Sequence, residues 1–183
     1  MIDGKRISLH TQLCLTNPDV YELCMAKLRG WLQSDESRPD YNPHTRRWVS
    51  VTQNDWRNWC ECPDCKAVDD AEGGPSGSYT RFVNKIAEAL EKEFPDVLVL
   101  MFSYMYTTEP PAVTRPRHNV IVQIANSMAG IGLSHPRATK YVDRVERWAK
   151  VSNRLYTWDY IAKFGAPFAD PFPTLWNHDE SIR

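Results

Sequence analysis

Val97-Leu98-Val99-Leu100-Met101-Phe102 is an unbroken apolar run that begins directly after Pro95-Asp96. A strand that is covered on both faces carries apolar residues at every position, as the strands of parallel sheets do. The run therefore predicts a buried strand at 97–102. The nearly all-apolar segment 119–125 predicts a second strand of the same kind.

Strand and helix patterns alternate on both sides of this run. Further strands are predicted at 12–16, 48–53 and 155–160. Helices are predicted at about 18–33, from Ser76 or Ser78 to the residues before Pro95, and after His135-Pro136. This alternation indicates a parallel α/β architecture with about five strands and three main helices. Such a set suits an open doubly wound sheet or an incomplete, TIM-barrel-like (β/α) barrel.

The first helix has the clearest signals. Asn17 is its expected N-cap, and Pro18 stands at its first position, where the missing N–H costs nothing. Apolar residues recur at helical spacing and predict an amphipathic helix. The residues at that spacing are Val20, Leu23, Cys24, Lys27, Leu28 and Trp31.

Composition narrows the function classes. The chain has 183 residues, of which 42% are hydrophobic, and its net charge is −1. This is enough for one domain core and gives no reason to expect a nucleic-acid partner. No apolar run approaches the roughly 20 residues of a membrane span, and the first residues lack the apolar region of a secretory signal. The phosphate-loop and dinucleotide-binding motifs are absent, and no cofactor is expected.

Five cysteines are too few for a disulfide scaffold at this length. Cys14 and Cys24 are expected to be small core residues, on a strand and a helix respectively. Cys60, Cys62 and Cys65 form a C-x-C-x-x-C cluster that suits a disulfide, a plain loop or, as the weaker alternative, zinc. A structural zinc site commonly has four ligands, and His44 is the candidate for the fourth.

Several motifs follow one another in a set order. They are Gln12–Pro18, Val49–Asp55, the cysteine cluster, Glu72–Gly77, Phe82–Asn84, Tyr104–Thr107 with Pro110-Pro111, Tyr156–Tyr160 and Pro171–Pro173. In this order they resemble the bacterial domain of unknown function 4838, a family that overlaps glycoside hydrolase family 163. The resemblance covers nearly the whole chain. It implies a (β/α) barrel like those of hexosaminidases and α-glucuronidases, with endo-β-N-acetylglucosaminidase activity on N-glycans.

The resemblance also implies a setting for the chain. Family members place the barrel in a longer exported protein, at the periplasm or cell surface, behind a signal peptide and a smaller α/β domain. We therefore expect residues 1–183 to be a single segment from the centre of the barrel, truncated at both ends, with a glycan and the rest of the parent chain as partners. If the longer protein carried no export signal, the expected location would be the cytoplasm instead.

One family feature has no counterpart here. After the strand at 119–124 the family commonly carries an Ile-Glu pair, whereas this chain reads Ala125-Asn126. If that glutamate is catalytic, this copy is impaired or works differently. The enzyme hypothesis therefore stands beside two others, a non-catalytic carbohydrate-binding barrel and an inactive fragment.

Glycoside hydrolysis needs an acid that protonates the leaving oxygen and a second group that stabilises the oxocarbenium-like state. In a retaining reaction on N-acetylglucosamine, the substrate acetamide can act as nucleophile while a carboxylate orients it. Asp55, Glu72 and Asp159 are the catalytic candidates, because each lies at or beyond a predicted strand end. Each also has a structural alternative: a turn for Asp55, a helix-dipole contact for Glu72 and an ion pair with Arg154 for Asp159.

Polar and aromatic side chains at the same strand ends are the candidate substrate-binding residues. Aromatic faces stack well on pyranose rings, although core packing alone also explains such residues. His135 has a role at a helix start as its alternative. The candidates are Asn54, Tyr104, Tyr106, His135, Trp158 and Tyr160.

Overall fold

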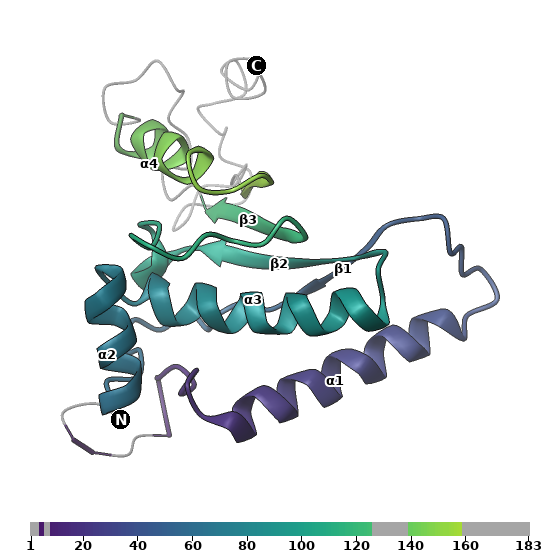
Figure 1. Ribbon diagram of the computed structural model, residues 1–183, viewed down its shortest axis with the longest axis horizontal. Helices are drawn as coiled ribbons and strands as arrows, with labels where there is room; N and C mark the ends of the chain where they lie inside the picture. The colour runs from purple at the N-terminus through teal and green to yellow at the C-terminus, as the bar shows by residue number, and fades with distance from the viewer. Residues whose placement is uncertain (1–3, 6–7, 126–138, 159–183) are drawn as a thin grey trace, which may run out of the picture.

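The computed structural model describes residues 4–5, 8–125 and 139–158 (Figure 1). The strands in this part of the chain form a four-stranded parallel sheet in the order β1-β2-β3-β4. They are β1 (Arg47–Ser50), β2 (Val97–Ser103), β3 (Val120–Ala125) and β4 (Leu155–Trp158). The parallel α/β architecture is therefore confirmed, and each of these strands lies where the sequence predicts one.

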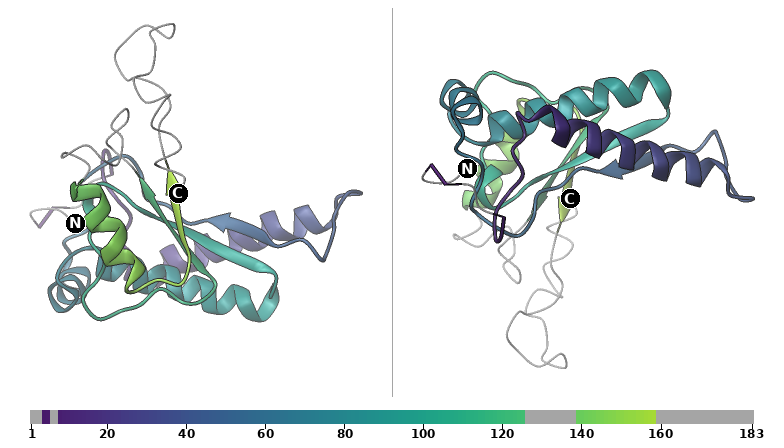
Figure 2. Two further views of the ribbon diagram at one scale, coloured as in Figure 1. Left: turned by 90° about the horizontal axis from the view of Figure 1, so that it is seen from above. Right: turned by 90° about the horizontal axis from the view of Figure 1, so that it is seen from below.

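The described helices alternate with the strands. They are α1 (Pro18–Glu36), α2 (Pro63–Glu72), α3 (Ser76–Glu93), α4 (Thr139–Ala149) and a short 3-10 helix, η1 (Met105–Thr107). The predicted start of α1 is confirmed, because the Asn17 side chain accepts a hydrogen bond of 2.8 Å from the N–H of Asp19. Figure 2 shows α1 and α3 running alongside the strands.

One sheet face is covered by helices. Alternate residues of the central strands point to this face and form one core with side chains of α1, α3 and α4. The register keeps these residues level, with Val99 beside Val120 and Val122 beside Leu155. The fully buried members include Met25, Val83, Ile86, Leu90, Val99, Met101, Val122, Ile124 and Trp148.

The opposite sheet face, called here the second face, carries a smaller buried cluster that is made of strand residues. Its buried cluster consists of the strand residues Leu98, Leu100 and Ile121, with Phe102 packed against them. Two tryptophans at its ends stay in contact with solvent, Trp48 with 63% and Trp158 with 45% of its surface exposed. Among the described residues, the helical members of the core thus gather on one face of the sheet.

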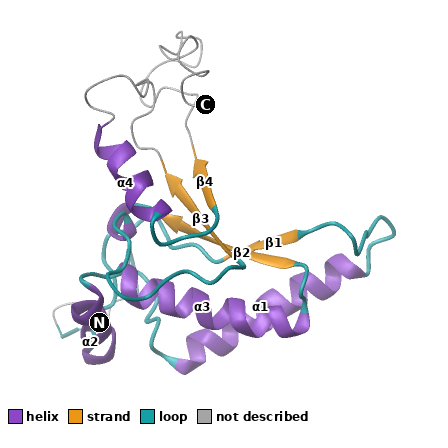
Figure 3. Cartoon of the chain, turned by 45° about the horizontal axis from the view of Figure 1, so that its top comes forward, coloured by secondary structure: helices purple, strands orange, loops and turns teal. Residues whose placement is uncertain are grey.

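All four strands end at the same edge, called here the carboxyl edge. In Figure 1, α2 lies beyond the ends toward which the β2 and β3 arrows point, and Figure 3 shows the strands fanning out from β2. The buried Tyr79 hydroxyl donates to the Val51 carbonyl (2.8 Å) and accepts from the Phe102 N–H (3.1 Å). Helix α3 therefore ties the chain after β1 to the end of β2.

The parallel α/β part of the prediction is confirmed, but a barrel is not. The described residues form four strands, not about five, and their sheet is open. The strand predicted at 12–16 is wrong, because no sheet includes these residues. The N–H of Gln12 bonds to the carbonyl of Asn58 (2.9 Å), and its side-chain amide donates to the carbonyls of Asn54 and Trp56. The backbone and the side chain of Gln12 thus hold this segment on the loop after β1.

Two helix predictions also need correction. The segment Pro63–Glu72 is helix α2, although the sequence favoured a loop there. In α1 the buried residues are Met25, Leu28 and Leu32, whereas Leu23 and Trp31 are exposed. Val20, Cys24 and Leu28 of the predicted stripe do pack in or against the main core. The buried stripe is rotated from the predicted one toward Met25 and Leu32, which recur with Leu28 at helical spacing.

The structure adds one observation on membranes. Among the described residues, none of the helices combines the length and the apolar character that a membrane crossing requires.

Candidate functional site

An aromatic group lies on the second face at the carboxyl edge. The Phe102 ring contacts Tyr104 edge-on at 6.4 Å and Trp158 edge-on at 5.6 Å between ring centroids. Trp158 ends β4 and Tyr104 directly follows β2, so the sheet brings together two residues that the sequence singled out. Phe102, which joins them, was missed as a site residue because it lies inside the apolar run of β2.

The backbone of Tyr104 is held in a polar frame. Its N–H donates to the Thr107 hydroxyl (3.2 Å), and its carbonyl accepts from the Gln53 side-chain amide (2.9 Å). The same amide donates to the Thr107 hydroxyl at 2.7 Å. Gln53 therefore ties the loop after β1 to η1 and fixes where the aromatic group begins.

Tyr106 belongs to η1, the short helix that Gln53 contacts at Thr107. Its ring stacks on Trp59 with 5.6 Å between centroids and 20° between planes. Burial raises the pKa of Tyr106, so the phenol keeps its proton at neutral pH and can donate a hydrogen bond. Tyr106 and Asn54 line a small pocket of about 90 Å³ together with Gln12 and Gln53. The structure thus places two more predicted residues, Asn54 and Tyr106, at one pocket.

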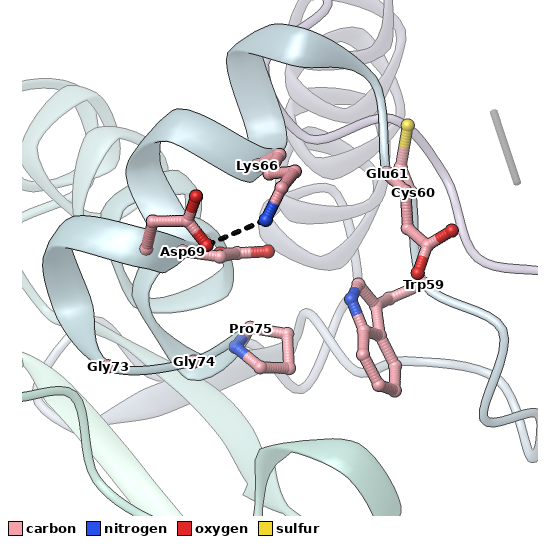
Figure 4. Close-up of a pocket in the computed structure, with 9 residues that line it drawn as sticks. Trp59, Cys60, Glu61, Lys66, Asp69, Gly73, Gly74 and Pro75 are labelled. Atoms are coloured by element: carbon pink, nitrogen blue, oxygen red, sulfur yellow. Dashed lines mark hydrogen bonds and ion pairs between the residues drawn. The ribbon is translucent and has the colours of Figure 1, made fainter. Parts of the chain in front are cut away.

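A larger polar pocket of about 430 Å³ opens beside Trp59 (Figure 4). Gly73 and Gly74 form one of its walls with φ angles of 77° and 154°, which are backbone conformations that L side chains rarely adopt. Because glycine has no side chain, a ligand can approach the backbone closely at this wall. The other lining residues are Cys60, Glu61, Lys66, Asp69, Asp70 and Pro75.

Asp69 is the buried acid of the polar pocket, and sequence reasoning missed it. Burial raises its pKa, while its hydrogen bond from the N–H of Ser78 (3.0 Å) acts in the opposite direction. Because Ser78 is in the first turn of α3, Asp69 serves as a cap for that helix from outside it. Lys66 pairs with the exposed Asp70 at 2.9 Å, the contact dashed in Figure 4.

Glu72 is buried at the end of α2 and has protein donors on both carboxylate oxygens. Oε1 accepts from the Arg81 guanidinium (2.7 Å) and the Thr114 hydroxyl, and Oε2 accepts from the N–H groups of Val113 (3.0 Å) and Thr114 (2.8 Å). Burial by itself raises the pKa of Glu72, but these donors outweigh it and hold the pKa at about 2. Its catalytic assignment stays a prediction and competes with this structural role.

Asp55 lies on an exposed stretch between β1 and α2. The neighbouring Asn54 donates its N–H to the Gln12 side-chain oxygen (3.1 Å), so the loop that carries Asp55 is anchored on one side. The predicted residues Asp159, Tyr160 and His135 lie outside the described residues, as does the stretch 126–133.

The cysteine cluster has a fourth member. The Sγ atoms of Cys14, Cys60, Cys62 and Cys65 all lie within 4.8 Å of one another. Cys14 is neither on a strand nor in the main core, which corrects its predicted role, whereas Cys24 packs against the core as expected. None of the cysteines forms a disulfide in the described part of the chain. These four thiols are a donor set that can hold a metal ion.

Comparison with known proteins gives one match. The family model described as "Domain of unknown function (DUF4838)" matches residues 1–183. No curated protein and no solved structure matches the chain.

Proposed function

The chain belongs to the DUF4838 family, and from this premise we propose that it is a glycan-binding segment of a glycoside-hydrolase-like (β/α) barrel. Its ligand is a glycan that contains N-acetylglucosamine. The ligand lies on the second face at the carboxyl edge, against Tyr104 and Trp158. The aromatic contact of Phe102 with both of these residues is the observation that carries the proposal.

The winding of the sheet supports a barrel rather than a doubly wound sheet. In doubly wound folds the strand order reverses once, and helices cover both faces. Here the order is sequential, and the helical members of the described core gather on one face. A sheet wound in one direction curls around its uncovered face, which becomes the barrel interior. Barrel enzymes bind their substrates at the carboxyl ends of the strands.

The chemistry of the aromatic group supports a sugar as ligand. Trp158 is 45% exposed although it is flanked by Phe102, so one part of its surface is available to a ligand. A flat aromatic surface packs on the apolar face of a pyranose, and nearby polar groups can bind its hydroxyls. The Tyr104 backbone is fixed by Gln53 and Thr107, so little ordering entropy is lost on binding there.

Hydrolysis is the second candidate activity, and it rests on the carboxylates. Asp159 follows Trp158 directly in the chain, and Asp55 follows β1 on an exposed stretch. A retaining, substrate-assisted reaction would need two such groups around the same sugar. Loss of glycan hydrolysis in Asp159→Asn with unchanged binding would support this activity. Equal hydrolysis by the Asp159→Asn variant and the unsubstituted protein would remove Asp159 from the proposal.

The binding proposal is tested with N-acetylglucosamine trimers by calorimetry on the purified chain. We expect Trp158→Ala to weaken binding by about tenfold, which corresponds to an aromatic contact of roughly 1.4 kcal/mol. Trp48→Ala is the matched control, because Trp48 is exposed at the opposite end of the strands. Absence of binding by the unsubstituted chain would contradict the proposal. Equal weakening of binding by both substitutions would contradict it as well.

A further inference from the structure

Four cysteine sulfurs surround one point between the N-terminal segment and the start of α2. Cys14 approaches Cys62 at 3.6 Å and Cys65 at 3.8 Å between Sγ atoms, and Cys60 completes the set within 4.8 Å. Cys60 and Cys65 are buried, whereas Cys14 and Cys62 are partly exposed. This cluster joins residues far apart in the sequence, because Cys14 and Cys62 are separated by 48 positions.

The spacing of these sulfurs fits a single tetrahedral ion. A Zn–S bond of about 2.3 Å places the corners of a ZnS₄ tetrahedron about 3.8 Å apart. The observed separations of 3.6 and 3.8 Å match that edge. They are far longer than the roughly 2.05 Å of a disulfide bond. An iron–sulfur cluster binds its cysteines through separate iron atoms, which spreads the four sulfurs more widely than one ion does.

We propose that Cys14, Cys60, Cys62 and Cys65 form a structural zinc site. On binding, each thiol releases its proton to solvent, four Zn–S bonds form, and the resulting tetrathiolate centre carries two negative charges. No oxidation or reduction takes place. Because the protein supplies all four ligands, the site has no open position for water or substrate, and its role is structural.

Groups around the cluster suit thiolate ligands. The Thr16 hydroxyl lies 3.2 Å from the Cys65 sulfur and 3.7 Å from the Cys62 sulfur, so it can donate to either of them. The N–H of Cys65 donates to the Cys62 sulfur at 3.5 Å. Cys62 is the N-cap of α2, whose partial positive charge favours an anion there. Donors that point at metal-bound sulfur are the usual second layer of such a site.

The site has a consequence for the carboxyl edge. Cys60 lines the polar pocket beside Trp59, and Cys62 begins α2. A zinc ion would therefore hold the pocket wall and the first turn of α2 against the N-terminal segment. Binding the metal contributes directly to the stability of this corner, because the unfolded chain cannot hold four thiolates at one point.

The experiment measures metal content and thiol reactivity on the whole chain purified under reducing conditions. We expect about one zinc per chain by elemental analysis. Before a chelator is added, a thiol reagent should modify no cysteine other than the partly buried Cys24, and the four cluster cysteines should react only afterwards. Cobalt(II) exchanged into the site should give the intense visible bands of tetrahedral thiolate coordination.

Two variants separate the site from a general effect of losing a thiol. Cys14→Ser should abolish stoichiometric zinc, whereas Cys24→Ser, the matched control on α1, should keep it. If Cys14→Ser does not fold, the chelator series on the unsubstituted chain decides by itself. A metal-free chain whose four cluster thiols react without a chelator would overturn the proposal, as would a disulfide detected by mass or one equivalent of iron in place of zinc.

Discussion

Glu72 shows how one side chain can hold three segments together. Glu72 is the last residue of α2. Its carboxylate pairs with Arg81 on α3 and accepts hydrogen bonds from the backbone N–H groups of Val113 and Thr114. A buried carboxylate is stable only when its oxygens are satisfied in this way. The loop at 112–114 is thereby fixed without a strand or helix of its own. The backbone adds one further bond, from the N–H of Ala112 to the Glu72 carbonyl (2.9 Å).

We expect Glu72 to make stability depend on pH. Burial alone would raise the pKa of Glu72. The hydrogen bonds have the larger effect and lower the pKa from an ordinary 4.5 to about 2. The unfolded chain therefore binds a proton first, so the stabilisation is complete above about pH 4.5 and is lost as the pH falls toward 2. Urea unfolding at several pH values measures this loss.

Glu72→Gln tests the same contacts at neutral pH. The amide cannot accept from all these donors, so we expect a loss of about 2 kcal/mol in the free energy of unfolding and a weaker decline in acid. Glu88→Gln is the control, because Glu88 is exposed and its removal should cost less than about 0.5 kcal/mol. If Glu72→Gln kept full stability and lost only glycan turnover, the catalytic assignment would be favoured instead.

At the scale of elements, the corner between α2 and α3 depends on close backbone approach. Gly77 stands in the first turn of α3, and a Cβ atom there would collide with the Cβ and Cγ atoms of Glu72. The two helices can meet this closely only because residue 77 has no side chain. Gly73, with a φ of 77°, ends α2 in the left-handed conformation that such a helix end requires.

Gly77→Ala should therefore destabilise the chain by about 1–3 kcal/mol through overpacking against Glu72. Gly30→Ala is a matched control in α1, because a Cβ atom at Gly30 meets nothing within 4 Å. A helix-interior glycine costs about 0.5–1 kcal/mol relative to alanine, so this control should stabilise the chain. Thermal unfolding of both variants checks the pair. The same sign of change in both would contradict the close-approach argument.

At the scale of the whole molecule, the sheet has a clear centre. β2 and β3 each have a strand on both sides, whereas β1 and β4 have one described neighbour each. The alternate buried residues of β2 and β3 also lie in the main core, packed with those of α3. Opening these central strands must break two ladders and expose that core, so their amides should open only with global unfolding.

Hydrogen exchange followed by NMR should reflect this difference. We expect the amides of Met101 and Val122 to exchange at least about tenfold more slowly than those of Val49 and Thr157. If flanking chain supplied further barrel strands, the same measurement on the longer protein would show slower exchange at both outer strands. Equal rates along all four strands would contradict the picture of a central pair.

Much of the element order follows from the sequence. The apolar runs of β2 and β3, the cap at Asn17 and the boundaries of α3 between Ser76 and Pro95 are local signals, and all three placed their elements correctly. The sequence did not predict helix α2, because its buried residues are Cys65, Asp69 and Glu72. Their burial depends on partners from distant segments, so the helix carries little apolar periodicity of its own.

The sequence by itself determined the strand–helix alternation, the family and the residues that gather near strand ends, because these depend on local patterns and motif order. Only the tertiary structure decided that the helical core lies on one sheet face, that Phe102 joins Tyr104 to Trp158, and that Cys14 meets the cysteine cluster. Contacts between residues far apart in the chain depend on strand order and packing, and a single residue such as Cys14 carries no local pattern that could announce its distant partners.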